Sequence, residues 1–289
     1  MNLFIGCVLG WYRLNVNKLR IITKCNLAEV ENALLILAND NEQVWKIINE
    51  LLLRNGYFSE QKRKRTMIDT YFDYKDKSLK NHKIELRIRS IEGGVSKITL
   101  KVLKKETPSH SERVEIERPW SRESFDEIMK ELSSLLGGHA FEHSAYYVNE
   151  DPENILTSAK FRKIQERKNE RDIINAINSQ PSELEFEFAI DRTFYHLSPP
   201  YKNYSLMELE IESKKTGNYE ILDRLVNELI TDHQSIFRLW PHSKLATGLA
   251  IEAMLSSREL KASEDFDNND LLTLSGAKKI ESFIKTNPI

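Results

Sequence analysis

Hydrophobic and polar residues alternate with a period of two along most of residues 26–214. Successive side chains of a strand point to opposite faces, so this alternation predicts strands with one apolar and one polar face. Gly93 and Gly94 interrupt one long alternating segment and predict a hairpin there. Strands are therefore expected over residues 26–37, 66–74, 83–105 (the hairpin), 111–120, 158–173, 182–197 and 204–214.

Elsewhere, apolar residues recur every three or four positions, which predicts amphipathic helices. Ser121 precedes one such segment as a candidate N-cap, and Gly56 follows the last turn of another. Strands and helices do not alternate regularly, which argues against a parallel α/β sheet. The predicted fold class is α+β, mainly antiparallel β. Helices are expected over residues 41–57, 121–138, 218–233 and 243–255.

Three parts of the chain differ in pattern. Residues 1–25 are expected to form an N-terminal extension, residues 26–258 one large domain, and residues 259–289 a tail or accessory helix. The chain has 289 residues, of which 40% are hydrophobic, so it is long enough to bury a substantial core.

The overall charge is nearly balanced. The 42 Lys and Arg residues face 44 Asp and Glu residues, so no surface field for long nucleic acid or an anionic membrane is expected. Two cysteines exclude a disulfide framework and a cysteine-based zinc site. Because no apolar run is long enough to cross a bilayer, a soluble cytoplasmic protein is the expectation.

The polar faces of five predicted strands consist almost entirely of charged residues. The segment LMELEIESK, residues 206–214, places three glutamates on alternate positions. Adjacent like charges repel, so such rows need compensation. Basic residues dominate the hairpin, whereas acidic residues dominate the two last strands. The rows are Glu85, Arg87 and Arg89; Lys97, Thr99 and Lys101; Arg113, Glu115 and Glu117; Glu183, Glu185 and Glu187; and Glu208, Glu210 and Glu212.

Two arrangements could accommodate these rows. In the first, an open sheet turns its charged face to water, which is ordinary for antiparallel sheets. In the second, about eight strands close into a barrel with the charges inside and helices on the apolar outside. The segregated signs favour the closed barrel, because Arg and Lys bind phosphate oxygens while clustered carboxylates bind a hard cation such as Mg²⁺ or Mn²⁺. A protein that binds a metal-chelated polyphosphate needs both the cations and the carboxylates.

The order of short motifs along residues 27–250 resembles the CYTH domain, the triphosphate tunnel metalloenzyme family. The motifs are Glu29-x-Glu31, TYFDY, LRIR, TLK, RVEIE, ELEIESK and HSKLATGL. The family includes class IV adenylyl cyclases, thiamine triphosphatases, inorganic triphosphatases and RNA 5′-triphosphatases. The resemblance implies an eight-stranded antiparallel tunnel with a charged lumen, outer helices, and Mg²⁺ or Mn²⁺ as cofactor.

Residue roles follow from this resemblance, position by position. One departure is Ala33, which stands where the family's E-x-E-x-K motif has its lysine and puts the activity class in question. Catalytic roles are implied for Glu29, Glu31 and Lys244. Phosphate binding is implied for Arg87, Arg89, Lys101, Arg113, Lys163 and Arg167. Metal binding is implied for Glu31, Glu115, Glu117, Glu208, Glu210 and Glu212.

Three functions are compatible with these residues. The first is a metal-dependent triphosphatase acting on inorganic triphosphate or on a nucleoside or other organic triphosphate. The second is a nucleotide cyclase, in which the ribose 3′-hydroxyl replaces water as the nucleophile. The third is a module that binds polyphosphate or nucleotide without turnover. The expected partner is a small-molecule triphosphate or nucleotide, with neither membrane nor long nucleic acid, and a homodimer is left open. A Walker A motif, which would indicate another mode of phosphate binding, is absent.

Overall fold

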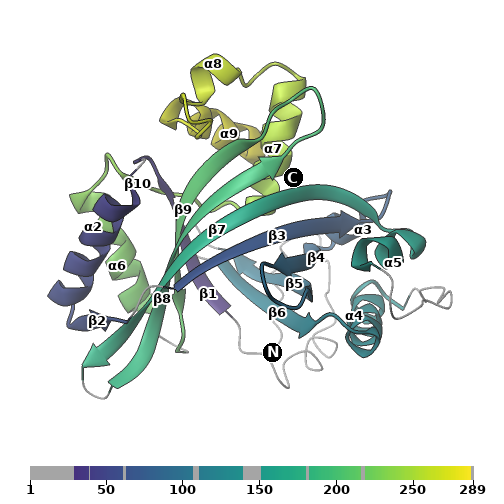
Figure 1. Ribbon diagram of the computed structural model, residues 1–289, viewed down its shortest axis with the longest axis horizontal. Coiled ribbons are helices and arrows are strands. Elements are labelled where there is room, and N and C mark those ends of the chain that lie inside the picture. The colour runs from purple at the N-terminus through teal and green to yellow at the C-terminus, as the bar shows by residue number, and fades with distance from the viewer. Residues whose placement is uncertain are drawn as a thin grey trace, which may run out of the picture.

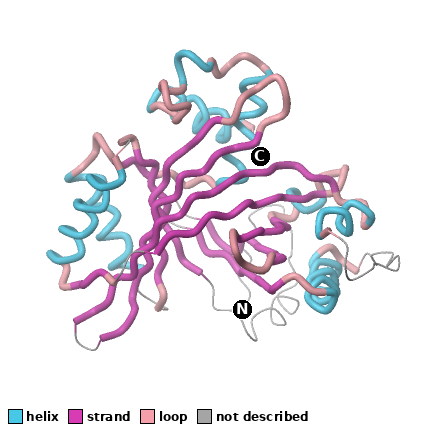
Figure 2. Tube along the Cα trace, viewed as in Figure 1, coloured by secondary structure: helices cyan, strands magenta, loops and turns pink. Residues whose placement is uncertain are grey.

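The strands of the protein form one twisted antiparallel sheet, seen in the computed structural model (Figure 1 and Figure 2). The structure describes residues 29–38, 40–60, 63–106, 111–138, 151–179, 182–215 and 219–287. The predicted extension, residues 1–25, lies outside them. The strands are β1 (Glu29–Ile36), β2 (Tyr57–Ser59), β3 (Arg63–Asp73), β4 (Ile84–Ile91), β5 (Lys97–Glu106), β6 (Ser111–Pro119), β7 (Arg162–Ser179), β8 (Ser182–His196), β9 (Tyr204–Ser213) and β10 (Phe237–Leu239).

Neighbouring strands follow the order β10-β1-β6-β5-β4-β3-β7-β8-β9, and β2 pairs with β7. Strand β1 also pairs with β9 over six residues, and with β6 over three. The prediction of a mainly antiparallel α+β fold is confirmed. The described sheet has ten strands where eight were predicted, because β2 and β10 have three residues each and are too short to show an alternating pattern.

The predicted helices all form, and side chains cap the N-termini of three of them, including the predicted cap at Ser121. Asp40 accepts a hydrogen bond from the backbone N–H of Glu42, and Ser121 and Ser243 each accept one three residues ahead. Three short helices, α3, α5 and α8, were not predicted. The helices are α2 (Asn41–Arg54), α3 (Ser78–Asn81), α4 (Arg122–Leu135), α5 (Pro152–Ser158), α6 (Tyr219–Asp232), α7 (Lys244–Ser256), α8 (Ala262–Asp265) and α9 (Leu274–Thr286).

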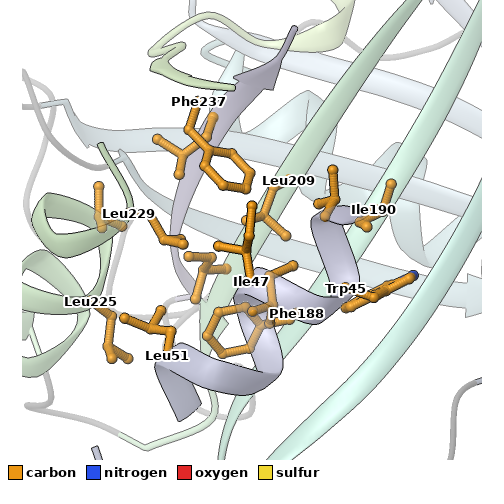
Figure 3. Close-up of a cluster of buried hydrophobic side chains, with 14 of the residues drawn as sticks. Trp45, Ile47, Leu51, Phe188, Ile190, Leu209, Leu225, Leu229 and Phe237 are labelled. Carbon is orange, nitrogen blue, oxygen red and sulfur yellow. The ribbon is translucent and has the colours of Figure 1, made fainter. Parts of the chain in front are cut away.

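The helices cover the apolar rows of the sheet. Figure 3 shows the first cluster, in which α2 and α6 pack on β8 and β9 through residues such as Leu51, Phe188 and Leu209. A second cluster joins α4 to β4, β5 and β6, and a third joins α7 and α9 to β8 and β9. Burying these side chains is the main stabilising term of the fold. The outward apolar rows that the alternation predicted are buried here: Ile88, Leu100, Ile116, Leu209 and Ile211.

The C-terminal residues pack on the sheet as an ordered unit (Figure 1). The buried carboxylate of Asp265 receives the ammonium of Lys279 at 2.8 Å. Arg238 of β10 pairs with Glu281 of α9 at 2.5 Å, so α9 is tied to the segment that precedes α7. None of the helices that the structure describes has both the length and the apolar character needed to cross a bilayer.

Candidate functional site

Charged side chains from six strands and helix α7 line one cavity of about 200 Å³. Seven cations and six carboxylates stand in its wall, so both signs of charge face the same space. Members of four of the five charged rows therefore converge on this cavity. The lining residues are Glu31, Tyr71, Glu85, Arg87, Arg89, Lys101, Arg113, Glu115, Glu117, Arg167, Asn169, Arg171, Glu210, Glu212, Ser243 and Lys244.

At one part of the wall, three arginines surround Asp69 of β3. Its carboxylate is fully buried and accepts hydrogen bonds from Arg89 at 2.7 and 2.9 Å. Arg167 and Arg87 approach it at 3.3 and 3.5 Å. Burial alone would raise the pKa of Asp69, but the arginines outweigh it and hold this pKa well below its usual value. We call these four residues the Asp69 cluster.

Strands β5 and β6 contribute cross-strand ion pairs. Lys101 lies 2.5 Å from Glu115, and Arg87 approaches Glu115 at 3.3 Å and Glu117 at 3.6 Å. Burial raises the pKa of Glu115, but Lys101 and Arg87 outweigh this effect and lower it to about 2. Glu117 also pairs with Lys97. Each of these carboxylates thus has a cation in place.

Lys244, the first residue of α7, lies among three carboxylates. Its ammonium is 3.0 Å from Asp191 and 3.0 Å from Glu208, and it also pairs with Glu210. Burial lowers the pKa of Lys244, but the charge of Glu208 and then those of Glu210 and Asp191 raise it well above its usual value. Lys244 is therefore a permanently charged group. Arg171 pairs with Asp191 and Glu210 from the opposite side.

Glu208 lies behind the cavity wall. Only 1% of it is exposed, and burial raises the pKa of its carboxyl group despite the nearby Lys244. It does not line the cavity and contacts Lys244 from behind. The structure therefore does not place Glu208 at the cavity, and its metal-binding role stays a prediction.

Glu31 and Glu212 face each other across β1 and β9 and both line the cavity. Arg113 lies 2.5 Å from Glu31, and Lys214 lies 2.7 Å from Glu212. Burial raises the pKa of Glu212, Lys214 opposes it, and the charges of Glu187 and Glu31 raise it further. We call Glu31, Glu187 and Glu212 the acidic group.

Two β-bulges turn predicted row members away from the cavity. Gln165 pairs with Tyr71 and Lys163 with Phe72, so Ile164 is an extra residue and the facing reverses there. Lys163 is half-exposed, and its ammonium pairs with Glu153 and Glu166 outside the cavity. Lys163 is thus not among the residues that line the cavity, and its phosphate-binding role stays a prediction.

The second bulge lies in β8, where the register against β7 shifts between Phe186 and Leu184. Glu185 accepts a hydrogen bond from Tyr57 at 3.3 Å on the helix-covered side, and Leu184 is partly exposed. Within the predicted row of Glu183, Glu185 and Glu187, only Glu187 joins the acidic group.

Three charged residues of this site were not predicted from the sequence: Asp69, Arg171 and Asp191. Arg171 has the same parity as Arg167 on β7, so the alternation carried the signal. Asp191 likewise has the parity of Glu187 on β8, whereas Asp69 stands among apolar residues of β3 and its ion pairs reveal its position.

The next question is whether side chains of the cavity could bind a metal ion. The described residues contain no group of three or more His, Cys, Asp or Glu side chains already arranged around a metal position. The acidic group nevertheless supplies hard oxygen donors in a partly neutralised setting, which suits Mg²⁺ or Mn²⁺. The side chain of Glu29 lies outside the described residues, although the Cα of Glu29 pairs with that of Arg113.

Fold and site together define an antiparallel β protein whose sheet gathers charged rows around a cavity. The model of the CYTH domain family matches residues 43–239, more than half of the chain. The chain belongs to the CYTH domain family. No curated protein matches it in sequence.

Solved structures resemble the chain at low identity. A candidate adenylyl cyclase from Hippeastrum, described as having a dominant triphosphatase activity, is 16% identical with a TM-score of 0.47; the match covers 82% of this chain and 99% of that one. A candidate adenylate cyclase from Bacillus halodurans is 16% identical with a TM-score of 0.41, covering 76% and 95%. The Mimivirus capping enzyme triphosphatase is 14% identical with a TM-score of 0.39, covering 75% and 94%.

Proposed function

We propose that the protein is a divalent-metal-dependent triphosphatase that removes the terminal phosphate of a small-molecule triphosphate. One observation carries this proposal: cations from β4, β5, β6, β7 and α7 converge on the same cavity as carboxylates from β1 and β9. A metal-chelated triphosphate presents negative oxygens and a cation at once, so it complements both. A simple anion or a simple cation would leave half of the wall without a partner.

The proposal includes a tunnel formed by eight strands. Its support is the pairing of β1, which forms antiparallel ladders with both β6 and β9. Strands β6, β5, β4, β3, β7, β8 and β9 connect these two ladders in sequence. A cavity surrounded in this way shields charges from water and strengthens their action on a bound phosphate chain.

The cationic residues would hold the phosphate chain. Lys101 and Arg113 are buried for most of their length and reach the cavity from adjacent strands, so they can contact neighbouring phosphates. Lys244 stays protonated, as its raised pKa requires, so it serves as a fixed positive charge and not as a base. These groups position and neutralise the phosphates, which supplies much of the rate in phosphoryl transfer.

The acidic side of the cavity would hold the cation. Glu31, Glu210 and Glu212 would be its ligands, and a bound Mg²⁺ or Mn²⁺ would neutralise phosphate charge and favour an attacking water. The oxygen of that water bonds to the terminal phosphorus while the bond to the bridging oxygen breaks. Diphosphate or a nucleoside diphosphate leaves, orthophosphate forms, and one proton passes to solvent.

Product analysis tests the function. The protein is incubated with tripolyphosphate or with ATP, each with Mg²⁺ or Mn²⁺, and the products are separated by chromatography. We expect orthophosphate with diphosphate or ADP, and no product in excess EDTA. A cyclic nucleotide with pyrophosphate would replace the proposal by a cyclase, and binding without any product would replace it by a binding module.

A pair of variants separates the site from the surface. Glu31→Gln keeps the size of the side chain but removes a cavity carboxylate, and we expect activity to fall on the order of a hundredfold. The matched control is Glu170→Gln, which changes an exposed carboxylate on β7 that pairs with Lys168 outside the cavity. Full activity of the Glu31→Gln variant would exclude the proposed metal position.

A further inference from the structure

Three residues at alternate positions of β7 line the cavity: Arg167, Asn169 and Arg171. Arg167 belongs to the Asp69 cluster, and Arg171 pairs with Asp191. Carboxylates of the protein therefore hold both arginines in place. Asn169 is the uncharged residue between them, and its Cα lies about 7 Å from that of each arginine, because alternate residues of a strand are two rises apart.

The side-chain amide of Asn169 is buried, but only one of its two ends has a partner. Asn169 is 1% exposed, and its Oδ1 accepts a hydrogen bond from the hydroxyl of Thr193 at 3.2 Å. Among the residues that the structure describes, none accepts a hydrogen bond from Nδ2 of Asn169, although this residue lines the cavity. A buried N–H group without an acceptor is unfavourable, so a ligand or an ordered water is expected to complete it.

We propose that Asn169 binds the substrate, with its Nδ2 donating to a phosphate oxygen that lies between Arg167 and Arg171. This inference rests on the proposed function, because its ligand is the phosphate chain of the triphosphate. The carboxamide suits this position because it supplies two N–H donors without adding a charge. A third cation beside the two arginines would be repelled by them, and a carboxylate would repel the phosphate chain.

Thr193 acts as a positioning residue for this amide. It is fully buried on β8, directly opposite Asn169 in the antiparallel ladder, and it does not line the cavity. Its hydrogen bond to Oδ1 directs the other end of the amide, Nδ2, away from Thr193. Without this bond, the amide could turn by half a rotation and present its oxygen to the phosphate instead.

Calorimetric titration of the full chain with tripolyphosphate in EDTA tests the contact, because the protein's own cations and donors then bind the ligand without turnover. Asn169→Asp keeps the shape of the side chain but replaces its N–H donors by a negative oxygen. We expect its dissociation constant to be about a hundredfold higher than that of the native chain, and that of Asn169→Ala about tenfold higher.

The matched control is Asn175→Asp, which makes the same change on the same strand. Asn175 does not line the cavity, and it accepts a hydrogen bond from Arg63 at 3.0 Å. We expect this variant to bind tripolyphosphate as the native chain does. Circular dichroism establishes that each variant is folded.

Thr193→Val separates ligand binding from a purely structural role. This change keeps the shape of Thr193 but removes the hydroxyl that orients the amide, so the dissociation constant should rise by less than in Asn169→Ala. If the amide served only as the partner of Thr193, both variants would lower the free energy of unfolding in a denaturant titration but leave the dissociation constant unchanged. That pattern would overturn the inference.

The outcomes for Asn169→Asp distinguish this inference from the proposed function. Unchanged binding of tripolyphosphate in Asn169→Asp, with orthophosphate still formed by the native chain, would overturn the inference alone. Tighter binding of Mn²⁺ by this variant, with no loss of tripolyphosphate binding, would place the amide oxygen at the cavity and also overturn it. Weakened binding in Asn169→Asp, with no product from the native chain and metal, would refute the triphosphatase and support the contact. A native chain that does not bind tripolyphosphate would overturn both.

Discussion

The Asp69 cluster and the acidic group differ in the charges that surround their carboxylates. Asp69 has three arginines within 3.5 Å, and its pKa is held well below its usual value. Glu212 has Lys214 at 2.7 Å but also two carboxylates nearby, and burial and those charges raise its pKa. Positive charges therefore predominate around Asp69, whereas negative charges predominate around Glu212.

We propose that this difference separates structural from ligand-binding charges. The arginines around Asp69 are ion-paired with it, so their position is set before any ligand arrives, and pre-set charges stabilise a transition state without reorganisation. The acidic group carries an electrostatic cost in the absence of a cation, and a bound cation would remove that cost. The cavity thus has one part whose cations are already paired with Asp69 and another part with an excess of negative charge.

The largest expected effect is on the Asp69 cluster itself. Asp69→Asn would leave two buried arginines and the partly buried Arg89 without their central anion, and removing one partner of a buried ion pair costs about 3–5 kcal/mol of unfolding free energy. Denaturant titration measures it. Asp126→Asn, an exposed residue of α4, is the control. An Asp69→Asn variant as stable as the native chain would show that the cluster is not a structural anchor.

The next largest effect should be a loss of stability in acid, caused by protonation of Glu115. The pKa of Glu115 is lowered from 4.5 to about 2 in the folded state, so its stabilising contribution is present above pH 4.5 and disappears as the pH falls toward 2. At neutral pH the free energy of unfolding of the native chain should be greater than that of Glu115→Gln by on the order of 3 kcal/mol. This difference should shrink between pH 4.5 and 2. A constant difference over this range would contradict the assignment.

Loss of one phosphate-facing cation should cost activity more than stability. We expect Lys101→Gln to lower kcat/KM by roughly 10–100-fold, because a charge-assisted contact to phosphate is removed. Lys163→Gln is the matched control, since the bulge at Ile164 places Lys163 outside the cavity. Triphosphatase assays compare the two. Equal losses of kcat/KM in both variants would show that a cation inside the cavity contributes no more to activity than one outside it.

The smallest effect should come from Glu212. Its raised pKa means that the ionised form destabilises the metal-free protein, so Glu212→Gln should be slightly more stable than the native chain at neutral pH. This gain should vanish as the pH falls below the unfolded value of 4.5, where the native carboxyl group is protonated too. Thermal unfolding with and without Mn²⁺ completes the test: the metal should stabilise the native chain more than the variant.

The alternating pattern by itself was sufficient to predict most of the fold. Leu100 and Ile116 lie under helices and Lys101 and Glu115 face the cavity, as strict period-two alternation requires. The order of motifs predicted the CYTH domain family, which the family model confirms. These properties are local, because each side chain's face depends only on its position along its own strand.

Bulges were beyond such local reasoning. The extra residue Ile164 reverses the facing of Lys163, and a similar shift removes Glu185 from its row. A bulge depends on the register against the neighbouring strand, so a single strand's sequence does not specify it.

The sequence alone determined which faces are charged and which family the chain belongs to. Only the tertiary structure decided which charges neutralise one another, because ion pairs such as Arg171 with Asp191 and Lys244 with Glu208 join different strands and a helix. Burial then sets their energies. Glu208 and Glu210 are two residues apart on β9, yet burial dominates at the first and raises its pKa, whereas Lys244 and Arg171 outweigh burial at the second and lower it.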